Sequence, residues 1–215
     1  MSKLASEFAK QYLETLKSLL DRLPLDAVDR VVAMLEAAYE TGHQIFVIGN
    51  GGSAATASHL MNDLCKGTLG EGPEGSPDWK RFRAIALTDN VSLLTAWAND
   101  AGYSRVFSEP LKNLAQPGDL LVAISASGNS PNILAAVEAA KRIGVRVVGL
   151  TGFDGGRLAK LADAALVVPS NEYGPVEDAH AVLGHIITSY LFQKIKATRT
   201  EVLLCAQNDG EFANR

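Results

Sequence analysis

The sequence predicts an α/β fold with a single doubly wound sheet of five parallel strands, preceded by two helices. Short, nearly all-apolar runs alternate with stretches of helical periodicity, as expected for a buried parallel sheet with helices on both faces. Each run is followed by Gly, Ser, Asn or Asp, which are turn residues. The predicted strands are 44–48, 82–87, 119–124, 145–150 and 165–168, in the flavodoxin-like order 2-1-3-4-5.

Two amphipathic helices (1–42) precede the sheet. Apolar residues recur at steps of three and four from Leu4 to Leu23, which predicts a first helix that ends before Pro24. A second helix begins near Asp26, whose side chain can serve as the N-cap, and ends at Gly42. Both helices carry a continuous apolar stripe, and such a stripe must be buried against another surface.

The rest of the chain divides into an α/β domain at 43–197 and a C-terminal tail at 198–215. A long last helix is expected from about Val176 to Ala197, and the residues after Thr198 are expected to be loosely attached. The segment 67–80 is rich in Gly and Pro and lacks apolar periodicity, which indicates a loop.

Composition excludes several classes of protein. The 215 residues are 47% hydrophobic and 20% charged, which suits one domain with a real core. A net charge of −4 disfavours a non-specific nucleic-acid contact, and two cysteines are too few for a disulfide scaffold or a thiolate zinc site. No apolar run is long enough to span a bilayer and the first residues do not resemble a signal peptide, so we expect a cytoplasmic protein.

Polar, glycine-rich loops follow the first and third strands: GNGGS at 49–53 and SASGNS at 125–130, each before a helix. Ligands of such sheets bind at the switch point between these two strands. Glycines allow close backbone approach, and the N–H groups at a helix N-terminus suit an anion. Either loop alone could be an ordinary turn, but together they predict a phosphate or phosphosugar site. The nucleotide-binding glycine motifs do not occur.

Histidines and nearby carboxylates are the candidates for metal binding or acid–base chemistry. His59 and Asp63 are four residues apart in a predicted helix (56–66), so one metal ion can take both ligands. Such a pair on its own is usually a surface hydrogen bond. The last helix adds further polar groups in an otherwise apolar stretch, which need partners if buried: Glu177, Asp178, His180 and His185. They could instead be satisfied core histidines and an acidic first turn.

The strings IGNGGSAATASHL and ISASGNSPNILAAVEAAKRIGVRVVGLTGFDGG resemble the sugar isomerase (SIS) domain, and within it the phosphoheptose isomerases. The resemblance extends over about residues 44–191. It implies an aldose–ketose isomerase that converts sedoheptulose 7-phosphate to a D-glycero-D-manno-heptose 7-phosphate through a zinc-stabilised enediol. It also implies a homotetramer with active sites between subunits, built on the N-terminal helices.

The resemblance implies that the serine loop (125–130) holds the phosphate and that the first loop (49–53) lines the sugar. The implied substrate contacts are Asn50, Gly51, Gly52, Ser53, Asp63, Asn99, Asp100, Ser125, Ala126, Ser127, Ser130 and Glu177. From the sequence alone, Asn99 and Asp100 could also be a helix C-terminus before Gly102. Ala126 replaces a hydroxyl residue that is usual in the family.

The resemblance also implies one zinc ion per subunit, with the ligands His59, Asp63, Glu177 and His185. Asp63 would be the catalytic base and His185 its partner acid or base, with His180 as the reserve ligand. Asp63 stands where the family has Glu and is one methylene shorter. Glu177 stands where the family has Gln and adds negative charge.

Two other functional classes stay open at this point. Some SIS proteins bind partners instead of catalysing, and the relative that associates with the replication initiator lacks the carboxylate found here at Asp63. The other class is sugar-phosphate sensing without turnover. The presence of Asp63 favours catalysis.

Overall fold

The computed structural model describes residues 4–69 and 80–212. One sheet of five parallel strands has the order β2-β1-β3-β4-β5, which confirms the predicted topology. The strands are β1 (Gln44–Ile48), β2 (Arg83–Ala86), β3 (Leu120–Ser125), β4 (Arg146–Thr151) and β5 (Ala164–Val167). Val47 of β1 pairs with Ala86 of β2 on one side and with Val122 of β3 on the other. β2 therefore lies on one side of β1, and β3 to β5 lie on the other side, which creates the switch point between β1 and β3.

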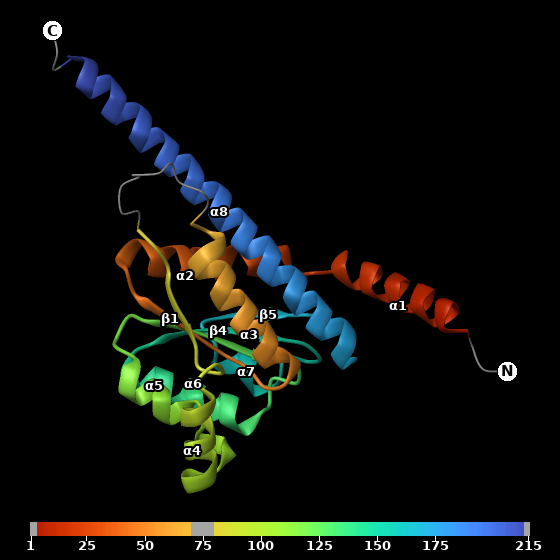
Figure 1. Cartoon of the computed structure of the whole chain (residues 1–215). Helices are drawn as coiled ribbons and strands as arrows, with labels where there is room; N and C mark the ends of the chain where they lie inside the picture. Colours follow the sequence, from red (N-terminus) through yellow and green to blue (C-terminus); the bar gives the residue numbers. More distant parts are fainter. Residues whose placement is uncertain (1–3, 70–79, 213–215) are drawn as a thin grey trace.

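Helices cover both faces of the sheet (Figure 1). Ile45 and Val47 face a core cluster with one set of helices, and Phe46 and Ile48 face a second cluster, as the two-residue period of a strand requires. The first set is α2 (Leu25–Thr41), α3 (Gly52–Asn62) and α8 (Tyr173–Phe212). The second is α4 (Val91–Ala101), α5 (Ser108–Leu114), α6 (Pro131–Ile143) and α7 (Gly156–Leu161).

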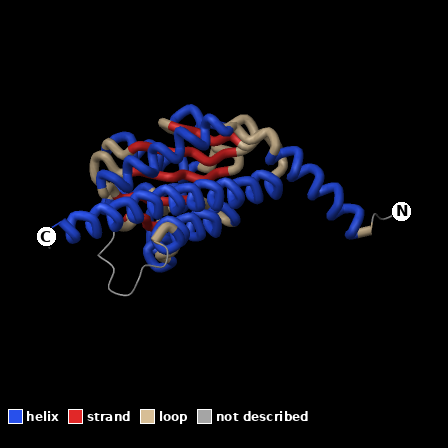
Figure 2. Tube along the Cα trace, turned by 90° about the horizontal axis from the view of Figure 1, so that it is seen from above, coloured by secondary structure: helices blue, strands red, loops and turns tan. Residues whose placement is uncertain are grey.

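Helix α1 (Ala5–Leu20) projects beyond the sheet and meets the first turn of α8 (Figures 1 and 2). The Tyr12 hydroxyl donates a hydrogen bond of 2.6 Å to Asp178 Oδ2 at this contact. Leu4, Phe8 and Leu13 of the N-terminal segment remain 66%, 62% and 62% exposed. A single chain therefore leaves much of the apolar stripe of α1 uncovered.

Two expected helix boundaries are wrong. Helix α8 continues to Phe212 instead of ending at Ala197, so residues 198–212 extend the helix. No Pro follows Thr198 and the first Gly is Gly210, so the chain has no strong stop signal there. Asp26 lies in the first turn of α2, where Pro24 is the N-cap residue, whereas Gly42 ends α2 with a φ of 74° as expected. The domain boundaries at 42 and 197 stay predictions.

The predicted loop at 67–80 can be followed only in part, because residues 70–79 lie outside the described residues. No helix within the described residues is both long and apolar enough to cross a membrane.

Candidate active site

A reciprocal pair of side-chain amides joins the loop after β1 to the start of α6. Asn50 Nδ2 donates to Asn132 Oδ1 at 2.9 Å, and Asn132 Nδ2 donates back to Asn50 Oδ1 at 2.8 Å. The Tyr103 hydroxyl donates to the same Asn50 oxygen at 3.0 Å. Asn132 is only 2% exposed, so the pair holds Asn50 in place at the switch point.

Sequence reasoning missed Asn132 and Tyr103. One sequence feature could have revealed Asn132: it is a polar residue in the first turn of a helix whose other buried residues are apolar. A buried amide in such a position requires a partner, and the partner here is 82 positions away in the sequence.

The first loop requires glycine for two separate reasons. Gly51 is the N-cap residue of α3 and has φ 54° and ψ −122°, a conformation that side chains disfavour. Gly52 lies against α8, because a Cβ on it would be 2.5 Å from Glu177 Oε2. The Glu177 carboxylate is therefore beside the first turn of α3, where the helix dipole favours a negative group.

The serine loop brings two hydroxyl groups together at the end of β3. Ser125 Oγ and Ser130 Oγ are 3.1 Å apart, and Ser125 is 4% exposed. Ser127 Oγ accepts a hydrogen bond of 3.3 Å from the Asn129 backbone N–H. Ala126 is buried, so its methyl group occupies a place where a hydroxyl would have to find a partner.

A group of His59, Asp63 and His185 lies on α3 and α8, with one ligand atom from each residue within 4.8 Å of the others. His59 Nε2 is 3.5 Å and His185 Nε2 is 3.9 Å from Asp63 Oδ2. The two imidazole Nε2 atoms are 3.3 Å apart. Both histidine side chains are more than half exposed, at 54% and 57%, whereas that of Asp63 is 21% exposed.

Helix geometry changes at Asp63. The α-helical turns of α3 end at Asn62, and a π-helical segment (η1) spans Asp63–Gly67. Its hydrogen bond runs from the Thr68 N–H to the Asp63 carbonyl at 3.0 Å. Such single π-turns occur frequently at functional sites. The predicted helix over 56–66 therefore exists, but its last turn is wider than the sequence pattern suggested.

Glu177 does not join the histidine group within one chain. It lies eight residues before His185 on α8, a rise of about 12 Å along the helix. Helices α3 and α8 run side by side, so Glu177 meets Gly52 near their starts and His185 meets His59 about two turns later (Figure 1). The structure thus gathers three of the four residues expected to bind zinc.

Three other expected residues lie away from this group. His180 is 1% exposed and its Nε2 is 3.1 Å from the Thr151 carbonyl oxygen, so it is a core histidine and lies apart from the histidine group. Burial lowers the pKa of His180, since desolvation disfavours the charged ring. Asn99 and Asp100 are exposed at the end of α4, where Asn99 donates to Asp100 Oδ1 at 2.8 Å.

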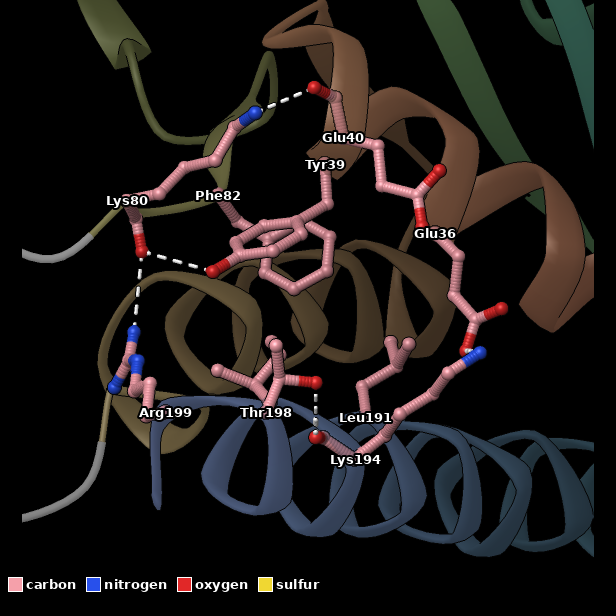
Figure 3. Close-up of a pocket in the computed structure, with 10 residues that line it drawn as sticks. Glu36, Tyr39, Glu40, Lys80, Phe82, Leu191, Lys194, Thr198 and Arg199 are labelled. Atoms are coloured by element: carbon pink, nitrogen blue, oxygen red, sulfur yellow. Dashed lines mark hydrogen bonds and ion pairs between the residues drawn. The ribbon is translucent and has the colours of Figure 1, made fainter. Parts of the chain in front are cut away.

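A separate cavity of about 280 Å³ lies between α2, α8 and Phe82, which precedes β2 (Figure 3). Tyr39 and Phe82 form an aromatic wall, with ring centroids 4.7 Å apart. Lys194 pairs with Glu36 at 2.8 Å, and the Lys80 ammonium donates to the Glu40 backbone carbonyl. This cavity is at the amino end of β2, whereas the two polar loops follow the carboxyl ends of β1 and β3.

Comparison with known proteins identifies the family. Residues 7–152 match the SIS domain. A phosphoheptose isomerase from Sulfurimonas denitrificans is 38% identical over 196 residues, which cover 91% of this chain and 97% of that protein. Solved structures of phosphoheptose isomerases from Neisseria gonorrhoeae and Francisella tularensis superpose with TM-scores of 0.78 and 0.79, both at 30% identity. They cover 88% and 89% of this chain, and 98% and 100% of their own chains. The chain therefore belongs to the SIS domain family, in which it is similar to the phosphoheptose isomerases.

Proposed function

We propose that the protein is a phosphoheptose isomerase, which converts sedoheptulose 7-phosphate to a D-glycero-D-manno-heptose 7-phosphate. The observation that carries this proposal is the carboxylate of Asp63 between two exposed histidines, in a chain similar to phosphoheptose isomerases. An aldose–ketose isomerisation needs one base, one acid and an electrophile near the carbonyl oxygen. A purely binding SIS protein needs none of these groups.

The serine loop is the proposed phosphate site. Its hydroxyls converge at the N-terminal end of α6, a helix of 13 residues whose dipole favours an anion. The start of α3 already faces the chain's own carboxylate, Glu177. The serine loop is therefore the more favourable of the two loops for phosphate, and Asn50, Gly51, Gly52 and Ser53 remain for the sugar. Asn99, Asp100 and Glu177 stay predicted substrate contacts.

The histidine group fits one zinc ion. His59 and His185 offer imidazole nitrogens and Asp63 a carboxylate oxygen, and zinc accepts both kinds of ligand. Three protein ligands are the usual number in catalytic zinc sites, which keep a position open for water or substrate. Zinc bound there would supply a Lewis acid that polarises the substrate carbonyl. Glu177 as a fourth ligand is a prediction from the family resemblance.

The chain's own residues would move the protons. Asp63 would take a proton from C1 of the ketose and return it to C2, while His185 would protonate O2 and accept the proton from O1. The transfers balance, because C1 and O1 each lose one proton and C2 and O2 each gain one. Imidazole and carboxylate side chains are common general acids and bases in enzymes, and both can give and take a proton in turn. Asp63 and His185 are each also a proposed metal ligand, so each would bind metal and transfer a proton only in turn.

We propose a homotetramer with active sites shared between subunits. His59 lies seven residues after Gly52, a rise of about 10 Å along α3. Within one chain the histidine group is therefore separated from the first loop (49–53). Beside His185, Ile186 and Tyr190 are 46% and 50% exposed, and α1 carries more uncovered apolar surface. A neighbouring subunit could cover these faces and bring its loops to the histidine group. The cytoplasmic location stays a prediction from the sequence.

The decisive experiment is to incubate the zinc-loaded protein with sedoheptulose 7-phosphate and follow the aldose product by NMR. Turnover that is lost with a chelator and restored with zinc supports the enzyme. Binding of the sugar phosphate without turnover would instead establish the sensing function. A monomer by light scattering would contradict the shared site.

A further inference from the structure

His180 lies in the core with one partnered and one unpartnered ring nitrogen. It is 1% exposed, and its Nε2 is 3.1 Å from the Thr151 carbonyl oxygen. A carbonyl oxygen can only accept, so Nε2 carries a proton, and because burial lowers the pKa of His180 and favours the neutral ring, Nδ1 carries none. Among the described residues, none meets Nδ1 with a hydrogen bond. The ring is thus a neutral donor whose one bond is directed at the end of β4.

The end of β4 is in turn bonded to the serine loop. The next residue after Thr151 is Gly152, and its N–H donates to the Ala126 carbonyl at 2.8 Å. Ala126 lies between Ser125 and Ser127, which belong to the proposed phosphate site. On its carbonyl side the Thr151–Gly152 peptide therefore accepts from His180 of α8 and, at 2.8 Å, from the Val168 N–H after β5, and on its N–H side it holds the serine loop.

Helix α8 is pressed against this peptide one turn before His180. A Cβ on Gly152 would lie 2.6 Å from both Cγ atoms of Val176, which is fully buried. Val176 and His180 are four residues apart and so share one face of α8. Glu177 and His185 of the same helix face α3. One helix therefore contacts both halves of the site.

We propose that His180 is a positioning residue. Through its hydrogen bond to the Thr151–Gly152 peptide, it fixes the position of the serine loop relative to α8, the helix that carries His185. The proposal rests on the proposed function, because it takes the serine loop as the phosphate site. A leucine of similar volume would fill the core but would release the Thr151 carbonyl from α8. The serine loop would then lose one of its connections to the histidine group.

The test compares three variants with inorganic phosphate as the probe, by calorimetry well below each unfolding midpoint. His180→Leu and His180→Asn cannot donate to Thr151, whereas His180→Gln places an N–H where Nε2 lies. We expect the first two to weaken phosphate binding about three- to tenfold, as for loss of one hydrogen bond. His180→Gln should stay within about twofold, and kcat should change less than KM in all three.

A core variant provides the control. Ile187→Val lowers stability from the same helix without touching Thr151, so its phosphate affinity should equal that of the wild type. If His180→Leu lowers the unfolding midpoint but leaves phosphate affinity and KM unchanged, His180 is only a core residue and the proposal is overturned. If His180→Leu does not fold, the pair His180→Asn and His180→Gln makes the same comparison.

A measurement on the wild type needs no substitution. Nitrogen-15 NMR should show His180 as the Nε2–H tautomer, with a resonance that shifts when phosphate saturates the protein. If this resonance does not shift when phosphate binds, the proposed connection between His180 and the serine loop is contradicted. The proposed function fails separately: a protein that binds phosphate but does not isomerise sedoheptulose 7-phosphate refutes the enzyme and leaves the role of His180 standing. A wild type that binds no phosphate overturns both.

Discussion

The serine loop and the histidine group differ in how much of each a single chain completes. The loop hydroxyls lie at the carboxyl end of β3, Ser125 is nearly buried, and backbone bonds brace the loop from β4. The histidine group lies on the outer surface of two helices, with both imidazoles more than half exposed. The first region is therefore buried and held in place within one chain, whereas the second is open to solvent or to a neighbouring subunit.

This difference separates binding from chemistry. A buried, braced loop binds an anion with little reorganisation, so its substitutions should affect affinity. Exposed side chains pack against few neighbours, so their substitutions should affect turnover or metal content with little effect on stability. Four substitutions or groups of substitutions test this division, in decreasing order of their expected effect.

The largest effect is expected for Asp63→Asn, which removes the proposed base. General base catalysis contributes about 10²- to 10⁴-fold, so kcat should fall by that amount while phosphate affinity stays unchanged. Steady-state kinetics with sedoheptulose 7-phosphate and phosphate calorimetry measure the two quantities. Asp21→Asn, an exposed carboxylate at the end of α1, is the matched control and should be neutral. Equal losses in kcat and phosphate affinity would mean that the two regions are not separable.

His59→Ala and His185→Ala should each reduce zinc affinity by at least about 100-fold and lower activity in parallel. The unfolding free energy should change by no more than about 0.5 kcal/mol, because both side chains are exposed. Elemental analysis after dialysis and thermal unfolding check the two values. His43→Ala, a histidine paired with Asp119 outside the group, should keep full zinc content. Retention of zinc by both variants would exclude the proposed metal site.

Ser125→Ala should weaken phosphate binding about tenfold, because a hydrogen bond to a charged group is lost. The rate constant kcat should change little, since the base and metal ligands lie elsewhere. Competitive inhibition by inorganic phosphate gives the affinity, with the exposed Ser92→Ala on α4 as control. A fall in kcat with unchanged phosphate inhibition would mean that Ser125 takes part in the isomerisation step and not in phosphate binding.

The smallest effect is expected at the contact between α1 and α8, beside Glu177. The hydrogen bond to Asp178 raises the pKa of Tyr12 from 10.0 to about 12. Because the folded-state pKa is raised, this contribution to stability is complete below pH 10 and is lost as the pH rises towards 12. Tyr12→Phe should therefore cost about 1 kcal/mol or less at pH 8 and almost nothing near pH 12. Denaturant unfolding at the two pH values measures this, and a pH-independent difference would contradict the bond.

Local patterns explain why the sheet and its two loops could be predicted. The alternation of apolar runs with helical periodicity determines a parallel sheet, and the glycine and serine strings directly follow β1 and β3. His59 and Asp63 are one helical turn apart, so their proximity also follows from local geometry. Their meeting with His185 came from the family resemblance, because that contact joins residues 126 positions apart.

The remaining features depend on how the helices pack on the sheet. The rotation of α8 follows from Val176 packing against Gly152, and this rotation directs His180 into the core and His185 towards α3. The rise of α8 separates Glu177 from the histidine group, although both were expected at one metal ion. The Asn50–Asn132 pair joins distant segments. Local sequence patterns therefore predict the periodic elements and the chemistry of the loops. Packing determines which side chains meet, because helix rotation and contacts between distant segments depend on the whole core.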